Sequence, residues 1–232
     1  MAVYNGEKFL IEQLDSIIPQ LSENDEIVIS YDQSTDGTLA LVTEYSQKDS
    51  RIKLIINNTP GLFANFENAI KFCSNDIVFI SDQDDIWDLQ KCSTVMKYFE
   101  ENDRIDMVIH NGIHFNSLTD EKSTDFFNLH NISNNRIRNF LKPRYSGCCM
   151  AFKRELTSTL LPIPSNVGGY DHWIGMVGET FGEIKFVDDI LIYHRLHNSN
   201  FTPTSRRGLI EVVKYRSLLL IELCKRWWKV RA

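Results

Sequence analysis

Three carboxylates stand close together at the end of a hydrophobic run in the first half of the chain. Asp82, Asp84 and Asp85 follow residues 77–81 (IVFIS), which have the composition of a buried β-strand. Open α/β folds bind ligands at the carboxyl ends of their strands. Hard oxygen ligands suit Mg²⁺ or Mn²⁺, usually shared with phosphate groups. The spacing therefore predicts a divalent metal site, and the alternative is a solvated acidic turn that caps a helix.

A second acidic turn, residues 32–37, begins with Asp32 and follows the strand-like residues 26–31. Strands and amphipathic helices alternate through the first 110 residues, which predicts a parallel sheet with right-handed crossovers. The further strands are expected at residues 1–4, 51–56 and 105–109. Because the carboxyl ends of parallel strands meet at one edge, we expect Asp32 and residues 82–85 to lie on the same edge of the sheet.

Two of the connecting helices bear directly on the site. The core face of the first is formed by four side chains: Phe63, Phe66, Ile70 and Cys73. Asn65 lies off this face, so we expect it to meet a ligand or solvent. The helix after the acidic cluster is expected to bury Leu89, Val95 and Phe99 at helical spacing.

The second half of the chain is less regular. Residues 116–135 are polar and are expected to form a long loop. Residues 145–152 are expected to form a strand, and residues 168–173 open a helix with Asp171 in its first turn. Two short strands are expected after that helix, at residues 184–187 and 190–193.

The composition narrows the class of protein. A chain of 232 residues that is 43% hydrophobic and 24% charged is typical of a globular protein, and a net charge of −6 disfavours nucleic acid as a partner. The five cysteines lack C-x-x-C spacing, which argues against a disulfide framework or a zinc site and fits a reducing, cytoplasmic compartment. No apolar run approaches the roughly 20 residues that span a bilayer. We interpret the N-x-[ST] triplets at Asn57, Asn131 and Asn200 as chance.

The end of the chain is basic. Residues 206–231 hold eight Lys or Arg residues against two Glu residues, together with Trp227 and Trp228. Such a helix can lie peripherally on an anionic membrane surface, here the inner membrane face, or it can pack on the domain with a solvated basic face. The expected organisation is one domain with two halves and a helix: residues 1–205, divided into 1–115 and 116–205, and residues 206–232.

Seven motifs in one order resemble the family 2 glycosyltransferases. They are Ala2-Val-Tyr-Asn-Gly-Glu, Asp32-x-Ser-x-Asp-Gly-Thr38, Asn65-Phe66, Ser81-Asp-Gln-Asp-Asp-Ile-Trp87, Gly147-Cys148, Asp171-His-Trp173 and Tyr193-x-Arg-x-His197. The fourth motif is similar to the bacterial rhamnosyltransferase-like branch, which builds surface polysaccharides. The resemblance covers residues 1 to about 200 and implies a GT-A fold, a Rossmann-like α/β fold with a mixed, mostly parallel sheet flanked by helices. It also implies a nucleoside-diphosphate sugar donor (dTDP-rhamnose or a UDP-hexose), Mg²⁺ or Mn²⁺, inversion at the anomeric carbon, and a glycan or lipid-linked acceptor.

The resemblance implies a donor site that nine residues form. They are Ala2, Val3, Tyr4, Glu7, Asp32, Asn65, Asp82, Arg195 and His197. Asp32 matches the carboxylate that hydrogen-bonds the pyrimidine base, and Glu7 lies near the ribose or base. Arg195 and His197 match groups near the diphosphate.

The resemblance also implies the metal ligands, the base and the acceptor cleft. Asp82 and Asp84 match the Asp-x-Asp pair, with Asp84 as the direct metal ligand. Asp171 matches the general base that takes the proton of the acceptor hydroxyl, although an Asp in the first turn of a helix can also act only as its cap. Gly147 and Trp173 are expected at the acceptor cleft.

The sequence departs from the family pattern near its start. The first strand lacks its upstream residues, and Tyr31 occupies a position that is often a second Asp. These departures motivate a second hypothesis, a nucleotide-sugar-binding pseudoenzyme or a truncated, inactive transferase. Haloacid-dehalogenase phosphohydrolases also end a strand with Asp-x-Asp. They carry Thr or Val two residues after the second Asp, where this chain has Ile86, so this class is disfavoured.

Overall fold

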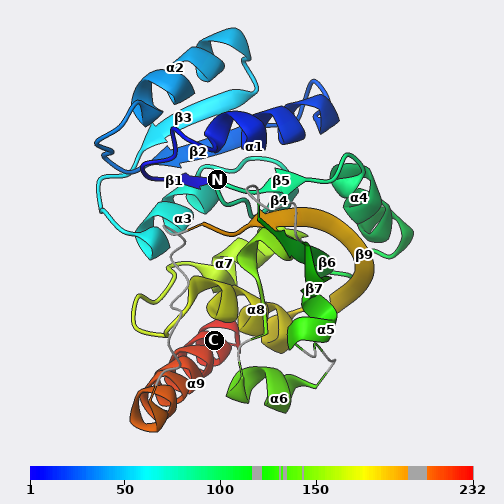
Figure 1. Ribbon diagram of the computed structural model, residues 1–232. Helices are drawn as coiled ribbons and strands as arrows, with labels where there is room; N and C mark the ends of the chain where they lie inside the picture. The colour runs from blue at the N-terminus through cyan, green and yellow to red at the C-terminus, as the bar shows by residue number, and fades with distance from the viewer. Residues whose placement is uncertain (117–121, 131, 133–134, 143, 198–207, 232) are drawn as a thin grey trace.

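The structure is a computed structural model, and it describes residues 1–116, 122–130, 132, 135–142, 144–197 and 208–231 (Figure 1). The first half contains β1 (Ala2–Val3), α1 (Leu10–Ile17), η1 (Ile18–Gln20), β2 (Ile27–Tyr31), α2 (Thr38–Lys48), β3 (Ile52–Ile56), α3 (Leu62–Lys71), β4 (Ile77–Phe79), β5 (Ile86–Trp87), α4 (Lys91–Glu101) and β6 (Met107–Phe115). The second half contains β7 (Lys122–Asp125), α5 (Phe126–His130), α6 (Arg136–Leu141), η2 (Gly147–Cys149), β8 (Met150–Lys153), η3 (Arg154–Leu156), α7 (Thr157–Leu160), α8 (Tyr170–Phe181), β9 (Ile184–Arg195) and α9 (Leu209–Arg231).

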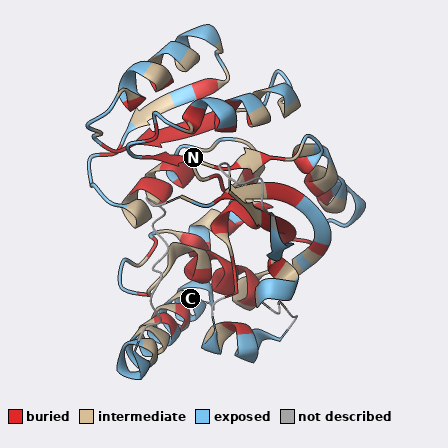
Figure 2. Cartoon of the chain, viewed as in Figure 1, coloured by how far each residue is buried: buried red, intermediate tan, exposed pale blue. Residues whose placement is uncertain are grey.

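The first sheet has the parallel order β1-β2-β3. Successive side chains of a strand point to opposite faces. Ile27 and Ile29 of β2 pack into a cluster with Leu14 of α1 and Val42 of α2, whereas α3 packs on β1 and β2 with Phe66 in the other main cluster. All five residues of β2 are consequently buried, and Figure 2 shows this strand as continuously red.

The second sheet is mixed and has the order β4-β8-β6-β9-β5, with β7 paired to β6. The expected single parallel sheet is therefore wrong for β4 and β6, because β8 lies between them and is antiparallel to both. Two antiparallel steps leave β4 and β6 running in the same direction. The mixed α/β fold flanked by helices agrees with the fold class expected from the sequence. The sheet joins strands of both expected halves of the domain.

Strand β9 is longer than expected. The two short strands predicted at residues 184–187 and 190–193 form one strand, Ile184–Arg195, that runs parallel to β6. The ladder shifts register between His110 and Asn111 and again between Asn111 and Ile113. The polar residues that separate the two apolar runs lie at these irregularities. For this reason the sequence pattern predicted two strands instead of one.

Two local expectations are corrected. Residues 116–135 are not one loop, because residues 122–125 pair with β6 as β7 and Phe126 of α5 is buried in the core. Helix α4 begins at Lys91, so Leu89 precedes it and is exposed instead of packed. Asn131 and Asn200, two of the triplets interpreted as chance, lie outside the described residues.

Helix α9 is the expected basic carboxyl-terminal helix, with Arg206 and Arg207 outside the described residues. Its Leu219 and Leu223 are buried in the cluster that also contains Ile174 and Val177 of α8. Within the described part of the chain, none of the helices, α9 included, combines the length and hydrophobicity needed to cross a bilayer.

Candidate active site

The loops after β1, β2 and β4 meet, as the sequence predicted for the two acidic turns, although β2 and β4 belong to different sheets. The amide of Gln83 pairs with the backbone of Tyr4: its Oε1 accepts from Tyr4 N and its Nε2 donates to Tyr4 O, both at 2.8 Å. On the other side of the same segment, Oε2 of Glu7 accepts from Gly37 N at 2.8 Å. The segment after β1 therefore joins the turn that begins at Asp32 to the turn that contains the Asp-x-Asp pair.

Asp32 is buried at the end of β2, and its carboxylate connects two loops. Its Oδ1 accepts from Asn57 Nδ2 at 2.6 Å, and its Oδ2 accepts from Gly61 N at 3.0 Å. Gly61 has φ of 126°, a conformation that L side chains rarely adopt. Each carboxylate oxygen has two lone pairs, so both can accept one further hydrogen bond from a ligand.

Ala2 and Val3 are buried beside this site, whereas Tyr4 is half-exposed. Asn65 is also buried, and its Nδ2 donates to Val3 O at 3.1 Å, so the expectation that it lies off the packed face is wrong. The reason is that α3 packs closely on β1. The Oδ1 of Asn65 is buried with no hydrogen-bond partner among the described residues.

Asp82 lies among negative charges. Burial and the nearby charge of Asp84 raise the pKa of Asp82 to about 7, and the charge of Asp171 contributes in the same direction. The hydroxyl of Tyr170 donates to Asp82 Oδ1 at 3.2 Å, which stabilises the ionised form and opposes this rise. Asp171, in the first turn of α8, accepts a hydrogen bond from His172 N at 2.7 Å. Two carboxylates distant in sequence are thus held in electrostatic contact.

The second carboxylate of the pair, Asp84, faces His197. Their Oδ2 and Nε2 atoms lie 2.9 Å apart. The imidazole ring stacks on Phe9 with ring centroids 4.5 Å apart. His197 lies two residues after the end of β9, and the antiparallel pairing of β9 with β5, which begins two residues after Asp84, positions it at the Asp-x-Asp loop.

The guanidinium of Arg195, which was expected near the diphosphate, is buried and bonded within the protein. Its Nε donates to the Asp84 carbonyl oxygen at 3.0 Å and its Nη2 forms an ion pair with Glu12. The guanidinium also lies between the rings of Phe9 and Phe115, 5.0 and 4.8 Å from their centroids. These contacts make Arg195 a positioning residue that fixes the backbone of Asp84.

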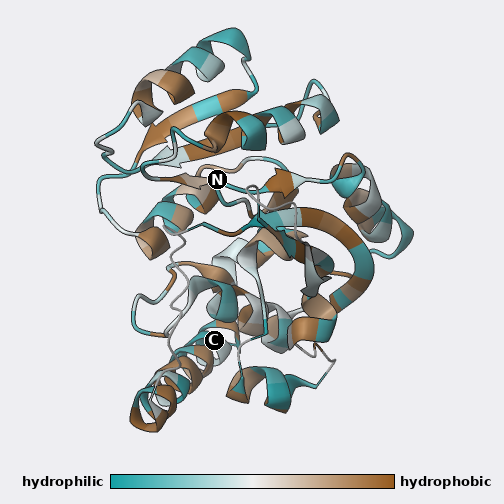
Figure 3. Cartoon of the chain, in the orientation of Figure 1, coloured by the Kyte–Doolittle hydropathy of each residue, from teal (hydrophilic) through white to brown (hydrophobic). Residues whose placement is uncertain are grey.

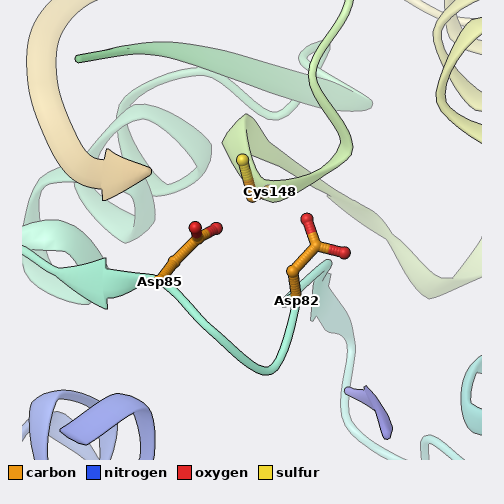
Figure 4. A group of neighbouring side chains, drawn as sticks. All are labelled: Asp82, Asp85 and Cys148. Carbon is orange, nitrogen blue, oxygen red and sulfur yellow. The ribbon is translucent and has the colours of Figure 1, made fainter. Parts of the chain in front are cut away.

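Sequence reasoning placed Asp85 only in the acidic cluster and Cys148 only in a family motif, and it did not single out Lys91. Asp85 is buried, and burial together with the charges of Asp82 and Asp84 raises its pKa well above the usual range. Its Oδ1 accepts from Arg195 N at 3.2 Å, whereas its Oδ2 has no partner among the described residues. Among the described residues, one group of three acidic, Cys or His side chains has ligand atoms within 4.8 Å of one another: Asp82, Asp85 and Cys148. Figure 4 shows these side chains converging.

Lys91 is a buried cation behind this group. Its Nζ donates to Cys148 O at 2.8 Å and lies 3.9 Å from the centroid of the Trp87 ring. Trp87 is itself buried and packs in the core. The burial of Lys91 could not be expected from its position, because lysines are rarely fully buried.

The two residues expected at an acceptor cleft have other surroundings. Trp173 is fully buried in the core, and its Nε1 donates to Leu160 O at 2.9 Å, so it cannot touch an acceptor. A Cβ at Gly147 would lie 2.5 Å from the hydroxyl oxygen of Tyr170. Gly147 therefore makes room for the tyrosine that bonds Asp82.

Known structures share this fold. The structure is similar to residues 1–349 of Staphylococcus aureus TarS in complex with UDP-GlcNAc, with a TM-score of 0.74 and 18% sequence identity. The similarity covers 95% of this chain and 64% of the TarS chain. The structure is also similar to glucosyl-3-phosphoglycerate synthase of Mycobacterium tuberculosis in complex with Mn²⁺, UDP-glucose and phosphoglyceric acid, with a TM-score of 0.57 and 21% identity over 97% of this chain and 76% of the other. The fold class is therefore that of the GT-A glycosyltransferases.

Comparison of the sequence with known families identifies the family. The family described as "Glycosyl transferase family 2" matches residues 1–161, and the chain belongs to this family. It is 26% identical over 207 residues to the uncharacterized glycosyltransferase alr2836 of Nostoc, which covers 85% of this chain and 63% of the relative. It is 42% identical over 93 residues to the dTDP-rhamnosyl transferase RfbG of Shigella flexneri, which covers 38% of this chain and 32% of the relative. The chain thus spans about one third to two thirds of the length of these curated relatives.

Proposed function

We propose that the protein transfers a sugar from a nucleoside-diphosphate sugar to an acceptor hydroxyl, with inversion at the anomeric carbon. The observation that carries this proposal is the approach of Asp171 to the Asp-x-Asp loop, maintained by the Tyr170–Asp82 hydrogen bond. A carboxylate that can take a proton then lies beside carboxylates that can hold a metal. Metal-assisted inverting transfer uses both groups at one reacting centre.

The donor would bind along the edge formed by the loops after β1 and β2. Asp32 has lone pairs left for the base, Tyr4 offers an exposed ring, and the buried Oδ1 of Asn65 has an unused acceptor position. A dTDP-rhamnose donor is supported by the similarity to RfbG, and a UDP-hexose by the neighbours that bind UDP-sugars. The acceptor would be a glycan or a lipid-linked sugar in surface polysaccharide synthesis, and the lipid-linked form is supported by the Escherichia coli relative WfgD, a glucosyltransferase named as acting on a diphosphoundecaprenol-linked sugar.

The residues at this edge fit a divalent metal. Asp84 Oδ2 and His197 Nε2 are close enough to share one ion, whereas the carboxylate of Asp82 lies with that of Asp85 and the thiol of Cys148. Carboxylate oxygens suit Mg²⁺ or Mn²⁺, and the Mycobacterium neighbour is described with Mn²⁺. Cys148 fits less well, because its buried thiol has a pKa raised well above its usual range and stays protonated. When bound, the ion would neutralise charge on the diphosphate.

In the transfer step, the acceptor oxygen forms a bond to the anomeric carbon as its proton passes to the Asp171 carboxylate. The bond between that carbon and the diphosphate oxygen breaks, and its electron pair remains on the leaving nucleoside diphosphate. Proton transfer to a positioned carboxylate typically contributes about 10²–10⁴-fold. The substitution Asp171→Asn keeps the shape of the side chain and removes the group that accepts the proton.

The test compares binding with turnover. Thermal unfolding with Mn²⁺ and a panel of dTDP, UDP, GDP, CDP and their sugars identifies the donor, because a ligand that binds only the folded state raises stability by about 2.7 kcal/mol at a hundred times its Kd. Release of nucleoside diphosphate is then measured with that donor. We expect Asp84→Ala to lose the metal-dependent shift, Asp171→Asn to bind the donor without turnover, and Asp103→Asn, at an exposed site, to behave as the wild type.

A second outcome supports the alternative function. If the wild-type protein binds a nucleotide sugar with Mn²⁺ but releases no nucleoside diphosphate, the chain is a nucleotide-sugar-binding protein and not a transferase. If no nucleotide changes the unfolding temperature, the donor site proposed at the β1 edge is refuted.

A further inference from the structure

Helices α6 and α9 lie side by side at the end of the molecule away from the first sheet (Figure 1). Nε of Arg216 in α9 donates to the carbonyl oxygen of Leu141 in α6 at 3.2 Å. An apolar cavity of about 430 Å³ lies between α6, α8 and α9, with Phe140 and Trp227 among its walls. We call the outward side of these two helices the α6–α9 surface.

The α6–α9 surface is positively charged on an acidic protein. Residues 136–142 and 208–231 hold nine of the chain's 25 Lys and Arg residues but two of its 31 Asp and Glu residues. The basic residues are Arg136, Arg138, Lys142, Lys214, Arg216, Lys225, Arg226, Lys229 and Arg231. Since the whole chain has a net charge of −6, positive charge is segregated at this end, and a complementary partner must be anionic.

Helix α9 has a second apolar face that points away from the domain. Leu219 and Leu223 hold the helix on the core, and Nη2 of Arg226 donates to Pro162 O at 2.7 Å. At 100° per residue, Ile210, Ile221 and Trp228 project from the opposite side; their exposed fractions are 88%, 49% and 69%. Figures 2 and 3 show α9 as largely exposed and carrying hydrophobic residues along its length.

Helix α6 continues this surface. Ile137 and Leu141 are four residues apart, so they share one side of the helix, and both are exposed. Arg136 and Arg138 flank Ile137 and are exposed too. Both helices therefore combine exposed aliphatic side chains with basic ones, and α9 adds the exposed indole of Trp228.

We propose that the α6–α9 surface docks on a membrane that contains anionic phospholipids. A helix with apolar and basic faces lies in the plane of the interface, with its apolar side chains at the boundary of the headgroups and acyl chains. Indole rings favour that boundary, and lysines bind the lipid phosphates. The positive charge favours an anionic membrane over a second copy of the chain as the partner, because two such basic surfaces repel each other.

The test is co-sedimentation of the purified chain with vesicles of phosphatidylcholine, alone or mixed with phosphatidylglycerol. We expect binding to the anionic vesicles and release from them at high salt. Lys214→Gln/Lys229→Gln should weaken partitioning by about fivefold per lysine, the factor that corresponds to about 1 kcal/mol each; Lys225 is kept because it pairs with Glu222. The control removes three lysines that form exposed ion pairs elsewhere: Lys48→Gln/Lys71→Gln/Lys97→Gln.

A second variant, Ile210→Ser/Ile221→Ser/Trp228→Ser, tests the apolar face, and it should lose vesicle binding while keeping the unfolding temperature. Equal binding to both kinds of vesicle, or the same loss with the control lysines, would overturn the proposal. So would a wild-type dimer in light scattering that this variant converts to a monomer without any vesicle binding, because the face would then be an interface between copies. Each readout is independent of sugar transfer.

Discussion

The hydroxyl of Tyr170 donates a hydrogen bond to Asp82 Oδ1, 3.2 Å away, across 88 positions of sequence. Tyr170 directly precedes the proposed base, Asp171, and Asp82 opens the Asp-x-Asp pair. The ring of Tyr170 is fixed by stacking on Phe66, with centroids 4.1 Å apart. One hydrogen bond therefore aligns the start of α8 with the carboxylates after β4.

Tyr170→Phe removes this bond and keeps the stacked ring. We expect the rate of sugar transfer to fall by about tenfold, because a small misplacement of a reacting group is costly, with a small change in unfolding temperature. The measurement is nucleoside-diphosphate release beside a thermal melt. Tyr98→Phe, in α4, serves as the control. An unchanged rate would show that the bond does not align the site.

Asp82→Asn should stabilise the metal-free protein more at pH 8 than at pH 5. The pKa of Asp82 is about 7 in the folded protein, against about 3.9 for an unfolded chain. Folding therefore takes up a proton between these values, so the stability contributed by protonated Asp82 is lost as the pH rises from about 4 to about 7. We expect a gain on the order of 2 kcal/mol at pH 8, or about 4–8 °C in Tm, and about a third of that gain at pH 5. Melts in a chelator at both pH values check this, and an equal gain at both would contradict it.

Arg195→Lys should weaken metal-dependent nucleotide binding although it conserves the charge. Lysine cannot reproduce the Nε bond to Asp84 O together with the pair to Glu12. We expect about a tenfold rise in the Mn²⁺ concentration needed for the nucleotide-induced melting shift, the low end of the effect of supporting residues on metal sites. Glu12→Gln is the matched comparison: the Glu12 side chain is 58% exposed, so its ion pair contributes less than about 1 kcal/mol. Equal effects of the two variants would contradict the role of Arg195 at Asp84.

Gly147→Ala should displace Tyr170, because the added Cβ would lie 2.5 Å from its hydroxyl oxygen. Overpacking of this kind costs about 1–3 kcal/mol, and the rate of transfer should fall with it. Gly208→Ala adds a methyl group where no described atom lies within 4 Å, so it should change neither property. Thermal melts and transfer assays of the two variants test the difference, and a normal rate for Gly147→Ala would show that the site tolerates the shift.

Removal of the metal should abolish donor binding. We expect EDTA to eliminate the nucleotide-sugar melting shift and added Mn²⁺ to restore it. His197→Ala should raise the Mn²⁺ requirement by about 10–100-fold if its imidazole joins Asp84 at the ion, whereas His194→Ala, one register position from Arg195 and paired with His114, should not. Donor binding that persists in EDTA would exclude metal bridging.

The sequence was sufficient for the features that depend on strand ends. The apolar run before Asp82 and the turn after Tyr31 predicted that two acidic loops would meet, and Gln83 and Glu7 join them through the segment after β1. Asp171 was likewise expected in the first turn of a helix, and it is found there. Periodicity and turn chemistry are local signals, so they report such positions well.

Burial was the property that the sequence could not report. Arg195 and Trp173 carry polar atoms that would suit a ligand, but both are enclosed and satisfied by carbonyl oxygens of Asp84 and Leu160. Lys91 was missed for the opposite reason, since a lysine beside Trp87 is expected in water. In each case the group that accepts the hydrogen bond comes from a distant segment of the chain. Local sequence patterns do not report such long-range contacts.

Strand β9 has a mechanical consequence. It begins at Ile184, shortly after α8, and ends at Arg195, so the proposed base and the histidine that faces Asp84 belong to one continuous segment. The strand is clamped along β6 by its parallel ladder. A displacement of α8 on arrival of an acceptor would therefore reach His197 only through β9, whose ladder with β6 is interrupted by two register shifts that can take up part of the movement.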